Sequence, residues 1–310
     1  MPDRSSSAPS AEQARPDELP RAFELTFHHA APRERRLRVA NALELIHRGE
    51  LDPAGVFVIR RIEDLAGAII CLPVPGASGL VWPPQTPERA PDSIELEDLL
   101  VATGLRWLRS RGAKLVQSLL AEQESNLAEP LLRNGFAHVT SLWYMRHPLR
   151  GPDLSVRNNL TLQKLADADP VLVRQTLLRS YEQSLDCPEV NGVRSIDEII
   201  EGHRSQGVHD PGRWWLATDR GQALGVLLLA SVPESSSMDL SYLGIVPDAR
   251  RRGIGRSLTC KAIQEARAAG AVQLTLAVDV RNQPAWQLYR SLGFEPFERR
   301  EVYLWIQPSC

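Results

Sequence analysis

Residues 240–258, LSYLGIVPDARRRGIGRSL, decide the fold, because they predict a strand, a tight turn and the beginning of a helix. Pro247 cannot donate a hydrogen bond to a neighbouring strand, so we expect the strand to end there. Ile254, Leu258 and Ala262 follow at intervals of four residues, which is typical of the buried face of a helix. The stretch therefore predicts a strand–turn–helix unit.

The beginning of this helix has the properties of an anion-binding site. Gly253 and Gly255 leave its first turn without side chains, and the backbone N–H groups of that turn have no partner within the helix. The helix dipole adds partial positive charge there, so a diphosphate is a natural ligand. Full positive charges flank the turn on Arg250, Arg251, Arg252 and Arg256. On its own, the pattern also fits a solvated helix start.

Two common phosphate-binding motifs do not occur. The chain has no GxxxxGK[ST] loop, and Gly253-x-Gly255-x-x-Leu258 lacks the third glycine of the dinucleotide-binding fingerprint. Neither a P-loop nor a Rossmann site is therefore expected.

A second segment, residues 278–294, VDVRNQPAWQLYRSLGF, narrows the choice of ligand. Pro284 suits the first turn of a helix with Asn282 as its cap, and Gly293 is expected to end that helix. Tyr289 lies between these signals. Taken alone, Tyr289 fits a core aromatic residue with a hydrated hydroxyl group as well as it fits a functional residue.

Together the two segments resemble the GNAT (GCN5-related N-acetyltransferase) superfamily. Residues 250–255, RRRGIG, match the family pattern of an arginine or glutamine followed by x-x-G-x-G/A. The later family pattern, N-x-x-A-x-x-x-Y-x-x-x-G-F, is matched in full by residues 282–294. The resemblance covers about residues 155–306 and implies an α/β fold with a mixed sheet.

The resemblance implies an N-acetyltransferase that uses acetyl-CoA as cosubstrate, requires no metal and passes the acetyl group directly to a primary amine. N–H groups of residues 251–257 would hold the pyrophosphate, and Asn282 would bind the pantetheine arm. Tyr289 would also protonate the leaving thiolate. The residues that the resemblance assigns to the cofactor are Leu243, Gly244, Ile245, Arg250, Arg251, Arg252, Gly253, Ile254, Gly255, Arg256, Ser257, Asn282 and Tyr289.

The general base is less clearly indicated. An amine with a pKa near 10 must lose a proton before it attacks. Glu189 and Asp239 are the first candidates, and Asp186 and Asp279 are further carboxylates near the expected acceptor cleft. Each also fits a solvated or structural group, and ordered water could relay the proton without a single base.

The two halves of the chain show the marks of a duplication. Residues 111–117 resemble residues 269–274, and residues 131–136 resemble residues 289–294. The glycines in these segments, Gly112 with Gly270 and Gly135 with Gly293, are separated by the same 158 residues. Coincidence remains open, because helix–glycine–strand junctions are common.

We therefore predict two tandem GNAT-like domains. Residues 1–20 form a disordered leader, 21–147 a degenerate domain, 148–158 a linker, and 159–310 the domain that binds acetyl-CoA. Within the first domain, the patterns predict strands at 23–27, 56–59, 67–72, 114–120 and 136–145, helices at 34–46 and 95–110, and a loop at 73–91.

The first domain is called degenerate because it lacks the residues that bind the cofactor. At the offset of 158 residues, Leu131 replaces the tyrosine and Glu124 the asparagine. Its loop at 81–93 has no GxG and no arginine cluster, and its prolines remove N–H donors. We expect this domain to shape the acceptor cleft or to stabilise the fold.

Composition excludes several other functions. The chain of 310 residues carries 36 Lys and Arg against 38 Asp and Glu, so a generalised nucleic-acid-binding field is not expected. Its four cysteines form no CxxC pair, which argues against a disulfide framework or a zinc site. The longest apolar run, 223–230, is shorter than the ~20 residues of a membrane span.

The resemblance implies an enzyme whose partner is a small-molecule or peptide amine, and we expect it in the cytoplasm. The sequence does not predict its oligomeric state, or whether the acyl group is acetyl or longer. The alternative is a non-catalytic acyl-CoA-binding sensor or interaction module. Tyr289 favours the enzyme, because a protein that only binds the cofactor does not need an acid at the leaving thiolate.

Overall fold

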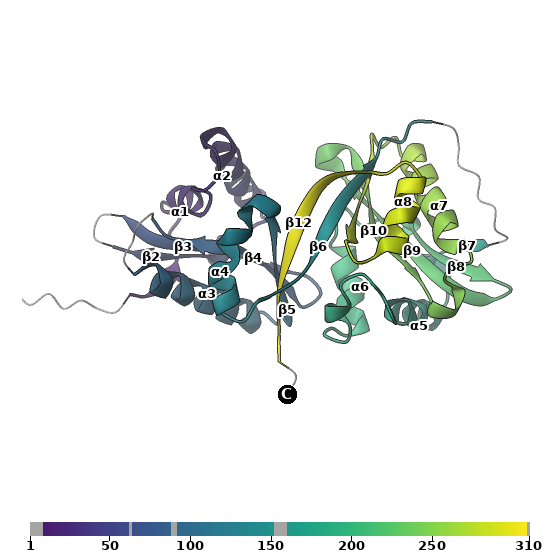
Figure 1. Ribbon diagram of the computed structural model, residues 1–310, viewed down its shortest axis with the longest axis horizontal. Coiled ribbons are helices and arrows are strands. Elements are labelled where there is room, and N and C mark those ends of the chain that lie inside the picture. The colour runs from purple at the N-terminus through teal and green to yellow at the C-terminus, as the bar shows by residue number, and fades with distance from the viewer. Residues whose placement is uncertain (1–8, 62–63, 88–91, 152–159, 309–310) are drawn as a thin grey trace, which may run out of the picture. The chain divides into compact units, whose positions relative to one another are not determined.

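The computed structural model describes residues 9–61, 64–87, 92–151 and 160–308. The chain forms two compact units (Figure 1). Unit 1 contains Met1–His138 and Val302–Cys310, and unit 2 contains Val139–Glu301.

Unit 1 is built from a sheet and four helices among its described residues. The sheet has the order β1-β2-β3-β4-β5, with the end of β12 beside β5. Neighbouring strands are antiparallel, except that β4 runs parallel to β5. The elements of this half of the chain are β1 (Ala11–Gln13), α1 (Leu19–Thr26), α2 (Pro32–His47), β2 (Val56–Arg60), β3 (Leu65–Val74), β4 (Ser78–Gln85), α3 (Ser93–Ser110), β5 (Leu115–Ala121), α4 (Glu129–Arg133) and β6 (Ala137–His147), most of which belongs to unit 2.

Unit 2 repeats the same succession of elements. Its sheet has the order β6-β11-β10-β9-β8-β7, with the beginning of β12 on the other side of β6. The elements are β7 (Thr161–Lys164), α5 (Pro170–Tyr181), α6 (Ile196–Arg204), β8 (Trp214–Asp219), β9 (Gln222–Val232), β10 (Ser237–Ile245), α7 (Ile254–Ala268), β11 (Leu274–Asp279), α8 (Gln283–Ser291) and β12 (Glu295–Ile306).

The mixed α/β fold and the duplication are confirmed by this correspondence. In each unit a strand, two helices, three strands, a helix, a strand, a helix and a strand follow in order. The parallel pair β10–β11 matches β4–β5. Gly112 and Gly270 both adopt a positive φ, +87° and +72°, because each follows the end of a helix where a side chain would be strained.

The helices of unit 2 cover both faces of its sheet. Trp215 and Ala217 of β8 pack in the cluster that contains α7, whereas Leu216 between them packs with α5 and α6. This alternation is the period of a strand with both faces buried. The buried stripe of α7 contains Ile254, Leu258 and Ala262, as the sequence predicts.

The strands β10 and β11 separate toward their carboxyl ends. Their parallel ladder covers only Met238 with Leu274 and Asp239 with Thr275. On its other side, β10 pairs with β9 as far as Ile245, with an irregularity between Leu240 and Tyr242. The carboxyl end of β10 therefore lies beside β9 without a continuing ladder to β11, which leaves room for a ligand.

Two predictions near the N-terminus are wrong. Ala11–Gln13 form β1, which pairs with β2, so only residues 1–8 of the expected leader lie outside the described residues. The expected strand at 23–27 belongs to helix α1. Leu19, Ala22, Phe23 and Thr26 are buried at spacings of three and four residues, and this helical period prevails over the short alternation.

The loop expected at 73–91 contains strand β4. The many prolines and glycines of this segment, among them Pro83 and Pro84, led to that expectation, because they are typical of loops. The parallel pairing with β5 involves only Ser78, Gly79 and Leu80, so neither proline lies in that ladder. Residues 88–91 lie outside the described residues.

The division of the chain also differs from the prediction. The units divide after His138 and after Glu301, whereas domain ends were expected at residues 147 and 159. As a result, residues 139–147 of β6 belong to unit 2 and the end of β12 belongs to unit 1. Of the expected linker, residues 152–158 lie outside the described residues.

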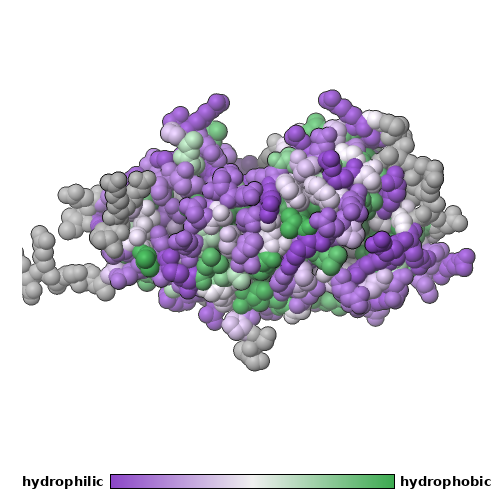
Figure 2. All heavy atoms as spheres, in the orientation of Figure 1, coloured by the Kyte–Doolittle hydropathy of each residue, from purple (hydrophilic) through white to green (hydrophobic). Residues whose placement is uncertain are grey.

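The surface of each unit is polar on the face shown in Figure 2, where hydrophilic residues cover most of the visible area. Across the described residues, every helix falls short of the length and hydrophobicity that a membrane span requires.

Candidate active site

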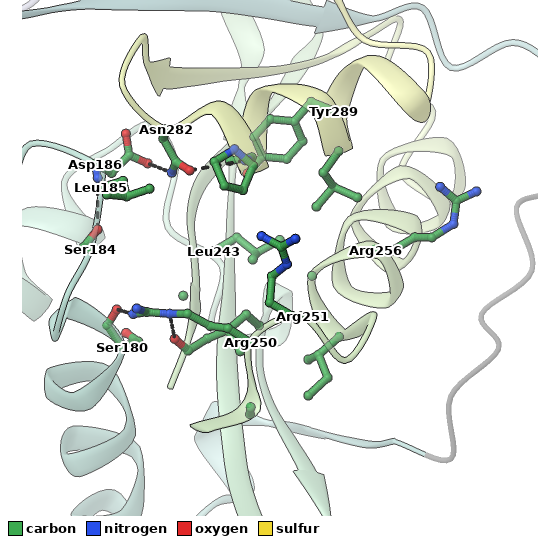
Figure 3. Close-up of a pocket in the computed structure, with 18 of the residues that line it drawn as sticks. Ser180, Ser184, Leu185, Asp186, Leu243, Arg250, Arg251, Arg256, Asn282 and Tyr289 are labelled. Carbon is green, nitrogen blue, oxygen red and sulfur yellow. Dashed lines mark hydrogen bonds between the residues drawn. The ribbon is translucent and has the colours of Figure 1, made fainter. Parts of the chain in front are cut away.

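A cavity of about 690 Å³ opens in unit 2 where β10 and β11 separate. It lies between the beginning of α7 and helix α8 (Figure 3). Eleven residues assigned by sequence to the cofactor line it: Leu243, Gly244, Ile245, Arg250, Arg251, Gly253, Ile254, Gly255, Arg256, Asn282 and Tyr289. Arg252 and Ser257 are not among the lining residues.

The beginning of α7 is free of side-chain caps. Gly253 is the N-cap residue, with φ +78°, and no side chain accepts a hydrogen bond from the first turn. A Cβ atom on Gly255 would lie 3.3 Å from Leu288 of α8, so glycine also permits close packing of the two helices. Gly253, Ile254, Gly255 and Arg256, at the start of α7, all line the cavity, and an uncapped helix start of this kind favours an anion.

The arginines beside this turn have different roles. Arg250 donates to the carbonyl of Ile245 at 3.1 Å and to those of Ser180 and Gln183 at 3.2 and 3.0 Å. It therefore joins β10 to the end of α5. Arg251 extends into the cavity below Tyr289 in Figure 3, where it can meet an anion.

Of the other two arginines, Arg256 lines the cavity and Arg252 does not. Arg252 is 3.6 Å from Asp219, and Arg256 donates to the Ser291 hydroxyl at 3.4 Å. The sequence did not distinguish these roles, because all four arginines carry the same charge and lie within seven residues.

Tyr289 comes from the middle of α8 and is 7% exposed. Burial raises the pKa of its hydroxyl above the ordinary tyrosine value, and the charge on Asp186 adds to this effect. The phenol therefore holds its proton throughout the neutral range, as a general acid must.

Asn282 caps α8 and is held in one orientation. Its Oδ1 accepts from the Ala285 N–H at 3.2 Å, and its Nδ2 donates to Asp186 at 3.5 Å. Asp186 also accepts from the Asp279 N–H at 2.8 Å. Burial raises the pKa of Asp186, and this residue also lines the cavity.

Glu189 lies outside the cavity lining and is engaged by Arg281. The two guanidinium Nη atoms donate to its carboxylate at 2.6 and 3.0 Å. This hydrogen bonding lowers the pKa of Glu189. Arg281 also donates to Asp279 at 2.7 Å, so Glu189 ties the loop after α5 to the loop before α8.

Asp239 lies at the last paired position before β10 and β11 separate. Its carboxylate accepts from the hydroxyls of Thr275 at 2.9 Å and Ser241 at 3.3 Å. Burial raises the pKa of Asp239, and these two hydrogen bonds oppose the shift only in part. It is not among the residues that line the cavity.

Ser180 and Tyr242 line the cavity but were not predicted from the sequence. Their hydroxyls lie 2.8 Å apart. A Cβ atom on Gly244 would lie 2.5 Å from Ser180 Oγ and 2.6 Å from the Tyr242 hydroxyl, so only glycine fits there. Ser180 comes from α5, far away in sequence, and no local pattern joins it to β10.

The corresponding positions of unit 1 have structural contacts. Leu131 is fully buried, whereas Tyr289 lines a cavity. Glu124, at the position of Asn282, accepts from Arg38 at 2.8 Å and contacts His29 at 3.2 Å. The hydrogen bond with His29 is the largest cause that lowers the pKa of Glu124 to about 2, and the hydrogen bond from Arg38 adds to it. Together they outweigh the effect of burial, which raises the pKa. A carboxylate that is already hydrogen-bonded to Arg38 and His29 is unsuited to bind the pantetheine amide.

The geometry agrees with the relationships of the chain. Residues 178–294 match the model of the acetyltransferase (GNAT) family. The C-terminal half of the chain therefore contains a domain of the acetyltransferase (GNAT) family. The chain is 29% identical over 252 residues to a mycothiol acetyltransferase of Thermobifida fusca. The alignment covers 69% of this chain and 74% of that protein.

Solved structures show the same fold. A GCN5-related N-acetyltransferase from Sphaerobacter thermophilus matches with a TM-score of 0.61 and 18% identity, over 100% of this chain and 98% of that one. A tandem GNAT protein from the clavulanic acid biosynthesis pathway matches with a TM-score of 0.53 and 14% identity, over 98% and 99%. The second match supports the tandem arrangement.

Proposed function

We propose that unit 2 transfers an acetyl group from acetyl-CoA to the primary amine of a small molecule. The observation that carries the proposal is one cavity that contains both an uncapped helix start and a buried phenol. A site for diphosphate binding alone would not need Tyr289 at its other side. The match to the GNAT family supports the same reaction.

The residues of the cavity fit acetyl-CoA. Its diphosphate would meet the N–H groups at the start of α7 and the guanidinium of Arg251, and Asn282 would bind the pantetheine arm. The backbone of β10 at residues 243–245 has no ladder to β11, so its polar groups are available to an extended ligand. When bound, acetyl-CoA supplies an activated acyl group.

Tyr289 is proposed to hold the proton that the departing thiolate needs. Its raised pKa keeps the phenol protonated, and its side chain lines the cavity. The remaining catalytic contribution comes from orientation, because holding an amine beside a bound thioester removes much of the entropic barrier.

Asp239 is proposed as the general base, acting through water because it lies outside the cavity lining. Its raised pKa makes it a stronger base than an ordinary aspartate. Glu189 was the other first candidate. Its ion pair with Arg281 lowers its pKa, which makes it a weaker base, so we propose that it positions the loop after α5.

The relatives indicate a small-molecule acceptor, because the aligned Thermobifida fusca protein is named for mycothiol. A panel assay tests this directly. The full chain with acetyl-CoA and single amines should release CoA thiol with at least one small-molecule amine, and the product should gain one acetyl group by mass spectrometry. Binding of acetyl-CoA without transfer to any amine or peptide would instead favour a sensor.

A further inference from the structure

A second cavity, of about 320 Å³, lies in unit 2 between the helices α5 and α6 and the strands β8 and β9. None of its lining residues lines the first cavity. Its volume falls at the lower end of the range for small-molecule sites, roughly 300–1,000 Å³. It is therefore large enough for a compact organic ligand.

The walls of the second cavity are apolar and well ordered by packing. Leu177 of α5 and Trp214 of β8 are 3% and 6% exposed, and Val226 and Leu228 of β9 are 0% and 1% exposed. Such a surface stabilises an aromatic or aliphatic body by removing it from water. A strongly polar ligand, such as a sugar, would lose its hydration against these walls.

One end of the second cavity is positively charged. Arg204, in the last turn of α6, lines it and has no ion pair with any residue that the structure describes. Arg174 also lines it, but its guanidinium is held by Asp197 at 2.7 and 2.8 Å. The uncompensated charge at this cavity is therefore that of Arg204.

Burial lowers the pKa of His209, and the positive charge of nearby Arg204 adds to this effect. Within the described part of the chain, the buried Nδ1 of His209 has no hydrogen-bond partner. A buried polar atom without a partner costs free energy. A ligand that brings a carboxylate to Arg204, which is exposed at the cavity, would add hydrogen bonds that the free protein lacks.

The second cavity shares a wall of aromatic rings with the first. His203 lines the second cavity, and its ring lies 5.0 Å from that of Tyr242, which lines the first. The Tyr181 hydroxyl lies 2.9 Å from His203 Nε2, and the Tyr181 ring lies 5.0 Å from the ring of Tyr242. His203 and Tyr242 therefore provide a direct packing contact between the linings of the two cavities.

We propose that the second cavity binds a small carboxylate with an apolar body, and that this ligand is an effector of the transferase. The apolar walls hold the body, and Arg204 holds the carboxylate. The effector role rests on the proposed binding of CoA in the first cavity, whereas binding in the second cavity is measured without CoA.

Calorimetric titration of the full chain with phenylacetate and with octanoate tests the site. At least one of them should bind once per chain, and the neutral analogue phenylacetamide should bind about tenfold more weakly than phenylacetate, as expected for loss of a charged hydrogen bond. If neither carboxylate binds at millimolar concentrations, the site is refuted.

Three variants locate the binding. Arg204 is exposed, so Arg204→Gln should fold normally and weaken carboxylate binding about tenfold. Ala166 is exposed at the cavity, so Ala166→Trp should block it. Arg36→Gln removes an exposed charge in α2 and should change nothing. Equal binding in all four proteins would place the ligand elsewhere and overturn the site.

The effector role is tested by the affinity for CoA. Saturating phenylacetate or octanoate should change the Kd of CoA about fivefold, within the usual range of coupling between sites, and Arg204→Gln should abolish the change. An unchanged Kd would overturn the effector role. If CoA does not bind at all, the proposed function fails, while carboxylate binding still decides whether the second site exists.

Discussion

Burial acts on Tyr289 and Asp239 in the same direction but with different chemical results. It raises the pKa of both side chains, because each is harder to charge away from water. For a phenol, this means that the proton stays in place and can be donated. For a carboxylate, burial strengthens its affinity for a proton, so it is better able to accept the proton that the amine must lose.

Replacement of Tyr289 by phenylalanine should separate catalysis from binding. Without the hydroxyl, kcat should fall about 100-fold, as expected for loss of a general acid, while the Kd of CoA stays within about twofold because the ring still fills its place. Steady-state kinetics and calorimetry measure the two effects. Unchanged turnover in Tyr289→Phe would exclude this residue as the acid.

Asp239→Asn should change the pH dependence of transfer. In the native protein the base must be unprotonated, so activity should rise with pH through the raised pKa of Asp239. In the variant, the rise in activity that follows ionisation of Asp239 should disappear, while the rise that follows deprotonation of the substrate amine should remain. Turnover at neutral pH should be about 100-fold slower. A profile of kcat from pH 4 to 9 checks this, and an unaltered profile would assign the base elsewhere.

At the scale of elements, the start of α7 depends on a conformation that glycine tolerates. Gly253 has φ +78° and leaves the N–H groups of the helix without a side-chain cap. The strand before it ends at Ile245, and Arg250 fixes the intervening turn to the end of α5. The position of the proposed anion site is thus set by the start of α7 and by Arg250.

Gly253→Val should weaken CoA binding at least tenfold, because a branched side chain both strains the positive φ and covers the N–H groups. Gly270→Val is the matched control. Gly270 has a similar φ of +72°, and a Cβ atom added there would have nothing within 4 Å, so its variant carries the strain without touching the site. Calorimetry should show loss of affinity in the first variant only, and equal affinities would contradict the assignment.

The loops before α8 and after α5 are joined through a buried charge. Asp279 is fully buried and is held by Arg281 and by Thr140, at 2.7 Å each. Burial alone would raise the pKa of Asp279, but these hydrogen bonds and those of backbone N–H groups lower it. The carboxylate therefore remains charged within the protein.

Arg281→Met should reduce the free energy of unfolding by about 3 kcal/mol, because it leaves the Asp279 charge without its ionic partner. Glu189→Gln breaks the outer, partly exposed part of the same cluster and should cost less than about 1 kcal/mol. Urea denaturation compares the two variants. A loss of equal size in both would show that the cluster is not organised around Asp279.

At the scale of the molecule, the sequence predicted the repeat of the elements but not the exchange of strands between the units. In this exchange, most of β6 belongs to unit 2 and the end of β12 belongs to unit 1. Gly112 and Gly270 end helices at corresponding points, so the 158-residue offset identified true equivalents. Residues 139–147, however, pair with β11 of unit 2. Alternating hydrophobicity predicts that a segment is a strand, but does not tell which sheet it joins.

In the candidate site, too, local motifs were found from the sequence, whereas contacts between distant segments were not. Gly253, Asn282 and Tyr289 were identified because their motifs are local and have fixed spacing. Ser180 and Tyr242 escaped because their contact depends on packing between α5 and β10. The different roles of Arg250 and Arg251 were also beyond the sequence, since they depend on which carbonyl groups lie within reach of each guanidinium.

The exchange of strands predicts how the chain can be divided. A fragment of residues 160–310 lacks the segment of β6 that pairs with β11, and exposes that strand edge. It should be less stable than the fragment 139–310 and more prone to aggregation. Thermal unfolding and light scattering compare them. Equal stability would show that β6 contributes nothing to unit 2.

The central claim is that unit 2 alone binds the cosubstrate, at the helix start opposite Tyr289. Calorimetric titration of the full chain with CoA tests it most directly. The account predicts saturable heat with one CoA bound per chain. Absence of heat at millimolar CoA, or two molecules bound per chain, would contradict it.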